Sequence, residues 1–313
     1  MTSSLSSSVS PHKRRKALPT LRRYKYIYLM LIPVLAYYII FHYAPMGGLV
    51  IAFQDYRPRL GFSRSPFVGL EHFRSFLTGV YAKRLIRNTL VINLLQICFG
   101  FPAPIILALL FHEMRENWYK KTLQTISYMP HFIAIVVLCG MLTQFSMTSG
   151  LFNDIGAFFG LPRVNYLSDP RYYRTLYIAS GIWQECGWGS IIYLATLSGV
   201  DHSLHEAAAI DGAGRIRRII HVNLPAILPI IVIQLIMRVG HIMSQGYEKT
   251  ILLYSSVNYE VSDIISSYVY RRGLEMQEYS FGAAVGIFNS IVNLVILVLA
   301  NWFSGKVSET SLW

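Results

Sequence analysis

The chain has 313 residues, of which 53% are hydrophobic and only 14% are charged, and its mean hydropathy is +0.41. Soluble domains carry roughly 25% charged residues. This much apolar side chain excludes a single water-soluble core and indicates an all-α, polytopic membrane protein in contact with membrane lipid. The net charge of +12 does not predict a nucleic-acid partner, because seven of the basic residues lie within the first 25 positions, directly before an apolar segment. That placement is typical of a cytoplasmic anchor for a membrane helix.

Six segments are apolar and long enough to cross a hydrocarbon core, which takes roughly 20 residues. In lipid every backbone amide needs an internal partner, so all six are predicted to be helices. The prolines inside them (Pro33, Pro102, Pro104, Pro130 and Pro229) are expected to kink these helices rather than end them. The segments are approximately 26–44, 88–111, 123–146, 175–199, 224–243 and 281–303.

The expected organisation is a basic cytoplasmic tail at 1–25, a transmembrane domain at 26–303 and a cytoplasmic tail at 304–313. The first apolar run is too long for a cleaved signal peptide, so it is predicted to remain as a span. With the N-terminus inside, the outward loops are 45–87, 147–174 and 244–280, and they carry 13 basic and nine acidic residues. Such a field attracts an acidic saccharide, although an acidic solute-binding protein would account for it equally well.

The three cysteines, Cys98, Cys139 and Cys186, lie in separate apolar stretches. An odd, scattered set predicts neither a disulfide framework nor a metal site.

A polar loop at 200–224 separates the fourth and fifth apolar segments. Ser203 and Glu206 have the spacing of a capping box, and the alanines that follow favour a helix. Gly212 is expected to end this helix in the left-handed conformation. A second short helix is predicted from Arg215 to His221, followed by Pro225 in the first turn of the fifth span. The product would be a helix–turn–helix wedge with a small alanine face suited to a groove on another protein.

The same loop resembles a known signature. Glu206-Ala207-Ala208, Gly212 and Val222-Asn223-Leu224-Pro225 match the pattern E-A-A-x3-G-x9-I-x-L-P, with valine in place of isoleucine. This pattern is similar to the EAA motif of permease subunits of binding-protein-dependent ABC importers, whose coupling helix docks on the ATPase. The resemblance implies ATPase-coupling roles for Ser203, Glu206, Ala207, Ala208, Asp211, Gly212, Arg215, Leu224 and Pro225, although a capping box alone would also explain Glu206.

The resemblance covers nearly the whole chain from about residue 25. "FVGLEHF" at 67–73, "GIWQECGWGSIIYLATLSGV" in the fourth span and "SDIISSYVYRRGL" before the sixth are similar to polysaccharide-type permeases, including those that import alginate oligosaccharides. It implies the six-helix fold of type I ABC importers and a place in the bacterial inner membrane. The implied partners are a second, homologous permease in a heterodimeric pore, two ATPase subunits, an external solute-binding protein and an oligosaccharide. The chain has no G-x-x-x-x-G-K-[ST] phosphate loop, so ATP and Mg are expected on the partner subunits, and neither a cofactor nor enzyme activity is expected here.

Two ionisable residues fall inside the spans that flank the loop. Glu185 lies 14 residues before Gly199 and Arg238 lies 14 residues after Leu224, so both are roughly 21 Å from the same boundary. Equal depth predicts a Glu185–Arg238 pair, with His241 one turn away. Whether such a pair fixes helix register or contacts substrate stays open.

Amides suit sugar hydroxyls and aromatic rings stack on pyranose faces, but both also pack membrane helices together. With this alternative open, the further candidates for the substrate pathway are Gln96, Trp183, Gln184, Trp188, Asn289 and Asn293, and no metal site is predicted. A competing hypothesis is an ion-coupled secondary transporter in which Glu185, Arg238 and His241 relay protons. It leaves the polar loop unexplained.

Overall fold

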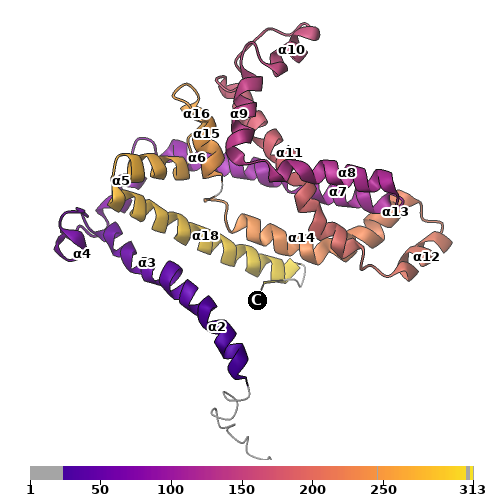
Figure 1. Ribbon diagram of the computed structural model, residues 1–313, viewed down its shortest axis with the longest axis horizontal. Coiled ribbons are helices and arrows are strands. Elements are labelled where there is room, and N and C mark those ends of the chain that lie inside the picture. The colour runs from indigo at the N-terminus through magenta and orange to yellow at the C-terminus, as the bar shows by residue number, and fades with distance from the viewer. Residues whose placement is uncertain (1–23, 245, 308–310, 313) are drawn as a thin grey trace, which may run out of the picture. The chain divides into compact units, whose positions relative to one another are not determined.

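The computed structural model describes residues 24–244, 246–307 and 311–312, so nearly all of the predicted N-terminal tail lies outside the described residues. Secondary structure in the described part is helical apart from one isolated bridge between Gln54 and Phe67. The chain forms two compact units, Met1–Val50 and Ile51–Trp313, each described by itself (Figure 1).

The first unit is built on a long apolar helix. It comprises α2 (Lys25–Tyr38), the π-helical turn η1 (Ile39–Tyr43), α3 (Ala44–Met46) and the first part of the 3₁₀ helix η2 (Gly47–Phe53), whose last three residues belong to the second unit. Together they make one helix of 29 residues that is apolar enough to cross a membrane. Pro33 lies inside α2 without ending it, as expected.

The second unit contains the remaining helices. Over the described residues of the whole chain, five helices are long and apolar enough to cross a membrane: Lys25–Phe53, Ala82–Glu113, Ile135–Phe158, Arg215–Val239 and Tyr279–Lys306. The elements are α4 (Gly61–Arg64), α5 (Glu71–Leu77), α6 (Ala82–Leu95), η3 (Gln96–Gly100), α7 (Pro102–Glu113), α8 (Trp118–Tyr128), η4 (Met129–Phe132), α9 (Ile135–Ser146), α10 (Leu151–Phe158), α11 (Pro170–Leu197), α12 (His202–Ile210), α13 (Arg215–Arg218), η5 (Ile219–Asn223), α14 (Leu224–Val239), α15 (Tyr247–Leu253), α16 (Tyr259–Ser262), α17 (Ile265–Val269), η6 (Tyr270–Glu275) and α18 (Tyr279–Val307).

The fourth predicted segment corresponds to α11, a single helix of 28 residues. It is not among the five apolar helices, because polar residues such as Gln184 and Glu185 lower its hydropathy. Its length alone, about 42 Å at 1.5 Å per residue, exceeds the thickness of a hydrocarbon core.

The prediction of one continuous helix at 123–146 is wrong. Helix α8 ends at Tyr128, Pro130 lies in the 3₁₀ turn η4, and Ile133 is extended before α9 begins. The neighbouring helix α11 makes this break possible. The side-chain amide of Gln184 donates to the carbonyl of Ile133 at 3.0 Å, and Gly187 lies so close that a Cβ there would overlap the carbonyl of Ser127. Because α11 satisfies the freed backbone group, Pro130 can end the helix here.

Three other prolines follow π-helical turns. The turns η1, η3 and η5 each end two residues before a proline, namely Pro45, Pro102 and Pro225. A proline lacks an N–H and its ring collides with the carbonyl four residues back, and a locally wider turn relieves both problems. At η5 this joins α13 to α14, so residues 215–239 form one helix. The expected separate helix from Arg215 to His221 is therefore wrong, whereas Pro225 lies in the first turn of α14 as predicted.

The long helices of the second unit pack in pairs. Helix α11 runs along α7, and α14 runs along α18 (Figure 1). A buried cluster that includes Ile105, Tyr193 and Ile227 brings α7, α11 and α14 together. These three helices position the larger cavity described below.

A buried ionic network holds segment 254–275 against α6 and α11. Asp263 is fully buried and pairs with Arg271 at 2.8 Å and with Arg84 at 3.7 Å. Its backbone carbonyl accepts from Asn88, whose side-chain oxygen accepts from Arg174 at 2.9 Å. The acid and its cations are thus each partnered within the second unit.

Candidate functional site

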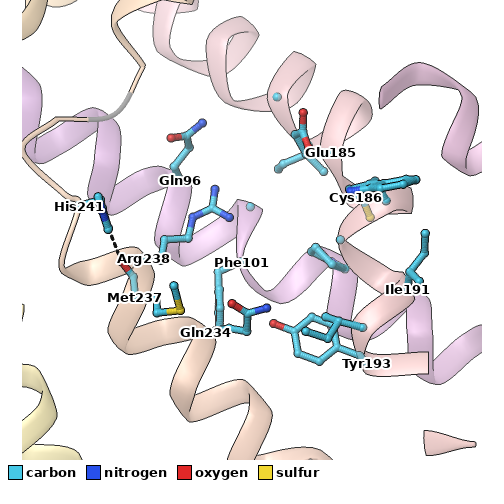
Figure 2. Close-up of a pocket in the computed structure, with 17 residues that line it drawn as sticks. Gln96, Phe101, Glu185, Cys186, Ile191, Tyr193, Gln234, Met237, Arg238 and His241 are labelled. Carbon is cyan, nitrogen blue, oxygen red and sulfur yellow. Dashed lines mark hydrogen bonds between the residues drawn. The ribbon is translucent and has the colours of Figure 1, made fainter. Parts of the chain in front are cut away.

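A cavity of about 770 Å³, with several polar side chains in a largely apolar wall, lies among η3, α7, α11 and α14 (Figure 2). Of the residues proposed from sequence for a substrate pathway, five line it: Gln96, Glu185, Trp188, Arg238 and His241. Tyr193 and Gln234 also contribute polar groups to its wall.

Arg238 extends from α14 into this cavity toward Gln96 (Figure 2). Within the described part of the chain it has no ion pair or hydrogen bond, and its Nε atom is buried without a partner. One terminal nitrogen lies 3.9 Å from the position that a Cβ of Gly100 would occupy. The predicted ion pair with Glu185 is therefore not formed, although Glu185 is near enough to act on Arg238 electrostatically. Among the described residues, no carboxylate pairs with the guanidinium group of Arg238.

The carboxylate of Glu185 has a different partner. His131, in η4, places its Nδ1 atom 3.1 Å from a Glu185 oxygen. The His131 ring stacks on Trp188 with centroids 4.6 Å apart and planes inclined by 2°. No sequence signal pointed to His131, because it reaches α11 only through the break between α8 and α9. The result is a stacked pair of aromatic rings beside an acid.

Lys249, in α15, lies behind the cavity wall, next to Gly181, and does not itself line the cavity. It is only 7% exposed, and its Nζ donates to the carbonyl of Tyr177 at 2.7 Å. A Cβ on Gly181 would stand 3.3 Å from Nζ and 3.5 Å from the side-chain nitrogen of Gln96. Burial lowers the pKa of Lys249 to about 8. The sequence placed Lys249 in an outer loop, and nothing in the local pattern indicated that it would be buried.

The fold of α15 explains where Lys249 lies. Gly246 begins the helix in the left-handed region, with φ +85°, and its carbonyl accepts from the hydroxyl of Tyr177 at 3.0 Å. The Tyr177 ring then lies beneath the Lys249 ammonium, 4.7 Å from its centroid. Tyr177 thus fixes both the start of α15 and its buried cation.

The remaining candidates on α11 and α18 lie outside the cavity. Gln184 caps the break at Ile133, and Trp183 is half-exposed on α11. Asn293 accepts from the backbone N–H of Met243 at 3.0 Å and donates to Ser244 at 2.7 Å. Asn289 is buried, with its side-chain oxygen unpaired.

The predicted cytoplasmic helix is α12, and its start differs from the expected capping box. The N-cap is Asp201, whose side chain accepts from the backbone N–H of Ser203 at 2.9 Å. This hydrogen bond lowers the pKa of Asp201. Glu206 does not reach back to Ser203 and instead lies 3.2 Å from His202. Asp201, two residues before Ser203, is the better N-cap, because its side chain accepts from a free backbone N–H in the first turn of the helix.

The end of α12 follows the prediction. Gly212 has φ +71°, and the N–H of Ala213 bonds back to the carbonyl of Ala208 at 2.8 Å. Nothing lies within 4 Å of a Cβ built on Gly212, so its left-handed conformation alone calls for glycine. Ala207 and Ile210 are exposed, so part of the small apolar surface of α12 is available to another protein.

A second cavity, of about 710 Å³, lies between α12 and the adjacent ends of α7, α8 and α11. Its wall includes His112, His205 and Arg218. Lys120 is buried there and pairs with Glu116. The α12 loop therefore rests over a polar hollow at the ends of the membrane helices.

The fold and the site together define the class. A helical protein with several membrane-crossing segments, a cavity with several polar side chains among its long helices and a capped, exposed helix at their ends has the organisation of a permease. It is a multi-pass membrane protein built for transport.

Residues 100–309 match the family described as the binding-protein-dependent transport system inner membrane component. The chain is 42% identical over 302 residues to the polygalacturonan/rhamnogalacturonan transport system permease protein YteP of Bacillus subtilis (strain 168), covering 96% of this chain and 94% of the relative. Protein LplB of the same strain is 40% identical over 95% of this chain and 93% of its own length.

A solved structure gives the same result. A chain of a bacterial alginate ABC transporter, in complex with an alginate pentasaccharide-bound periplasmic protein, superposes with a TM-score of 0.87 at 40% identity over 94% of this chain and 99% of that chain. The protein belongs to the family of binding-protein-dependent transport system inner membrane components. It is a permease subunit of a bacterial ABC importer and works with a binding protein, while ATP hydrolysis belongs to partner subunits. This membership overturns the ion-coupled alternative.

Proposed function

We propose that this chain forms half of a heterodimeric pore that imports an acidic oligosaccharide. In this proposal α11 is the sixth span, which completes the type I permease fold, and both termini are cytoplasmic. The tail at 1–25, the transmembrane domain at 26–303 and the tail at 304–313 keep the boundaries expected from sequence. The length of α11 and the basic residues before residue 26 support this arrangement.

The substrate class follows from chemistry and similarity. Two relatives carry names or descriptions that refer to polygalacturonan and to the acidic polysaccharide alginate, and both polymers are uronates. The cavity wall offers Trp188 as an aromatic ring, with His131 stacked on it, and Gln96 and Gln234 as amides. Arg238 supplies positive charge in the wall, and Lys249 adds a buried positive charge behind Gly181. This set suits sugar rings, hydroxyl groups and carboxylates together.

Coupling to ATP hydrolysis would occur through α12. Two ATP-binding subunits would each hold one permease by its coupling helix, and here the small surface around Ala207 would enter the ATPase groove. The loop that carries α12 joins α11 directly to the helix that contains α14, and both helices wall the cavity. A displacement of α12 would therefore move two cavity walls. This connection is the observation that carries the proposal.

The proposal is tested in a reconstituted complex of this chain with its partner permease, ATPase and binding protein. Uronate oligosaccharides should stimulate ATP hydrolysis, and Gly212→Ala should abolish most of that stimulation, because alanine is strained at φ +71°. Gly214→Ala is the matched control. It adds the same methyl group in the same loop, also with nothing within 4 Å, but its φ is −67°. Equal stimulation in both variants, or transport without the ATPase, would count against the proposal.

A further inference from the structure

We propose that Arg238, Lys249 and Gln96 form a cradle that binds one carboxylate of the oligosaccharide during its passage. This inference rests on the proposed function. It adds the position at which the carboxylate binds and a preference for charged over neutral sugars. The cradle would distinguish a charged uronate from its neutral ester inside the permease. The selection would therefore act after the binding protein has released the sugar.

Charge balance is the first argument. Arg238 has no ion pair within the described residues, and Lys249 Nζ is bonded to a neutral carbonyl, that of Tyr177. The carboxylate on the cavity wall, Glu185, is already bound by His131 at 3.1 Å. An unpaired charge at membrane depth is costly and usually faces a substrate path or a partner. An incoming carboxylate would supply the missing negative charge.

The space at this place is the second argument. Gly100 lies under the Arg238 guanidinium, and Gly181 lies between Lys249 and Gln96. A Cβ would stand 3.9 Å from the Arg238 nitrogen at the first position, and 3.3 Å from Lys249 Nζ and 3.5 Å from the Gln96 nitrogen at the second. Both glycines belong to the cavity wall. Because neither position carries a Cβ, the Arg238, Lys249 and Gln96 nitrogens are not covered by a side chain from these two wall residues.

Donor chemistry is the third argument. A carboxylate has two oxygens that accept several hydrogen bonds, and a guanidinium fork binds them in pairs. Lys249 uses one of its three N–H groups on the carbonyl of Tyr177, and the side chain of Gln96 makes no hydrogen bond within the described part of the chain. The donors present therefore match a carboxylate better than a hydroxyl group. A methyl ester is neutral, so it would not supply the negative charge that pairs with Arg238.

The test compares an oligogalacturonate or alginate oligosaccharide with its methyl ester in the reconstituted complex. The binding protein is the same in every sample, so its own preference cancels when variants are compared with the wild type. Arg238→Gln should raise the half-saturating concentration for the acid about tenfold and change that for the ester little, since a hydrogen bond to a charged group is lost. Arg163→Gln is the control, because Arg163 forms an exposed pair with Asp154 away from the cavity.

A second variant keeps every charge in place. Gly181→Ala would put a methyl group into the cradle, and it should weaken the acid more than the ester. Gly140→Ala is its control, because a Cβ there meets nothing within 4 Å. This pair decides the question even if Arg238→Gln fails to assemble.

The outcomes separate the two proposals. If no uronate stimulates the wild-type complex, the substrate class in the proposed function is wrong. If the wild type responds but the acid-to-ester ratio is unchanged in Arg238→Gln and Gly181→Ala, the cradle is wrong and the proposed function stands. An equal loss for acid and ester would indicate a structural role and would also overturn the cradle.

Discussion

Two regions of the second unit contain buried charges, and they are built differently. At Asp263 the carboxylate is fully buried and is held by Arg271, by Arg84 and by the hydroxyl of Ser267 at 2.9 Å. In the cavity, Arg238 has no ion pair or hydrogen bond within the described residues, and Glu185 is taken by a histidine. In the first region the carboxylate and both arginines have partners, whereas in the second region Arg238 has none among the described residues.

The difference separates structural charges from those available to a ligand. A buried pair is costly to break because each partner is left without solvent or a counter-charge. A cation without a counter-ion adds no pairing energy to the folded state. Its presence at membrane depth therefore indicates a role in binding. The comparison makes opposite predictions for the two regions.

The largest effect is expected from Asp263→Asn. Removing this charge leaves Arg271 and Arg84, whose side chains are 17% and 33% exposed, without their buried counter-ion, which should cost about 3 kcal/mol. Thermal unfolding of the purified complex, followed by fluorescence, would measure the loss. Asp154→Asn is the control, because its pair with Arg163 is half-exposed and should contribute about 0.2–1 kcal/mol. Similar midpoints for the two variants would remove the distinction between the regions.

The same substitution should have different effects at Arg271 and Arg238. Arg271→Gln should destabilise the protein by several kcal/mol because the buried carboxylate of Asp263 loses its nearest cation. Arg238→Gln should change the free energy of unfolding by less than about 1 kcal/mol. Unfolding midpoints of the two variants, measured side by side, test this. A large loss in Arg238→Gln would mean that Arg238 has a structural partner after all.

A smaller effect is expected from pH. The pKa of Lys249 is about 8, so the ammonium is about nine-tenths charged at pH 7 and about one-tenth charged at pH 9. The charged form is lost as the pH rises, and the half-saturating concentration for an acidic oligosaccharide should therefore rise several-fold between these values. The titratable groups that act on Lys249 are Glu185 and Cys139, with the Tyr177 ring beneath it.

The measurement is stimulated ATPase activity against oligosaccharide concentration at each pH. The methyl ester corrects for the pH response of the ATPase itself. In Lys249→Gln this part of the pH dependence should disappear. An unchanged pH profile in that variant would assign the dependence to another group.

The smallest effect is expected where charges are fully accessible to solvent. His202 and Glu206 pair on α12 with 86% and 68% of their side chains exposed. His202→Ala should change stability by about 0.3 kcal/mol, close to the limit of measurement. A change above 1 kcal/mol in the same unfolding assay would show that exposure is a poor guide to the strength of these pairs.

Much of the fold could be predicted from local patterns. Long apolar runs predicted membrane helices, and five of the six segments overlap one long apolar helix each. Gly212 predicted the end of α12, because a left-handed turn needs glycine wherever the rest of the chain lies. Pro33 and Pro229 lie inside continuous helices, as expected for prolines surrounded by good helix formers.

The errors occurred where one helix depends on another. Pro130 ends a helix because Gln184 of α11 supplies the donor that the break needs. Ser203 is not the N-cap, because its own backbone N–H already donates to the side chain of Asp201, which caps the helix.

The sequence by itself determined the class of protein, most of the helical spans and the glycine end of α12, whereas the coupling role of the loop at 200–224 and the matched depth of Glu185 and Arg238 stay predictions. These properties depend on hydrophobic runs, spacing and backbone conformation, which neighbouring residues decide. Only the tertiary structure decided that Glu185 pairs with His131, that Lys249 is buried behind Gly181 and that Arg238 stays free. Side-chain partners depend on which helices approach each other and how closely, and no local pattern in the sequence contains that information.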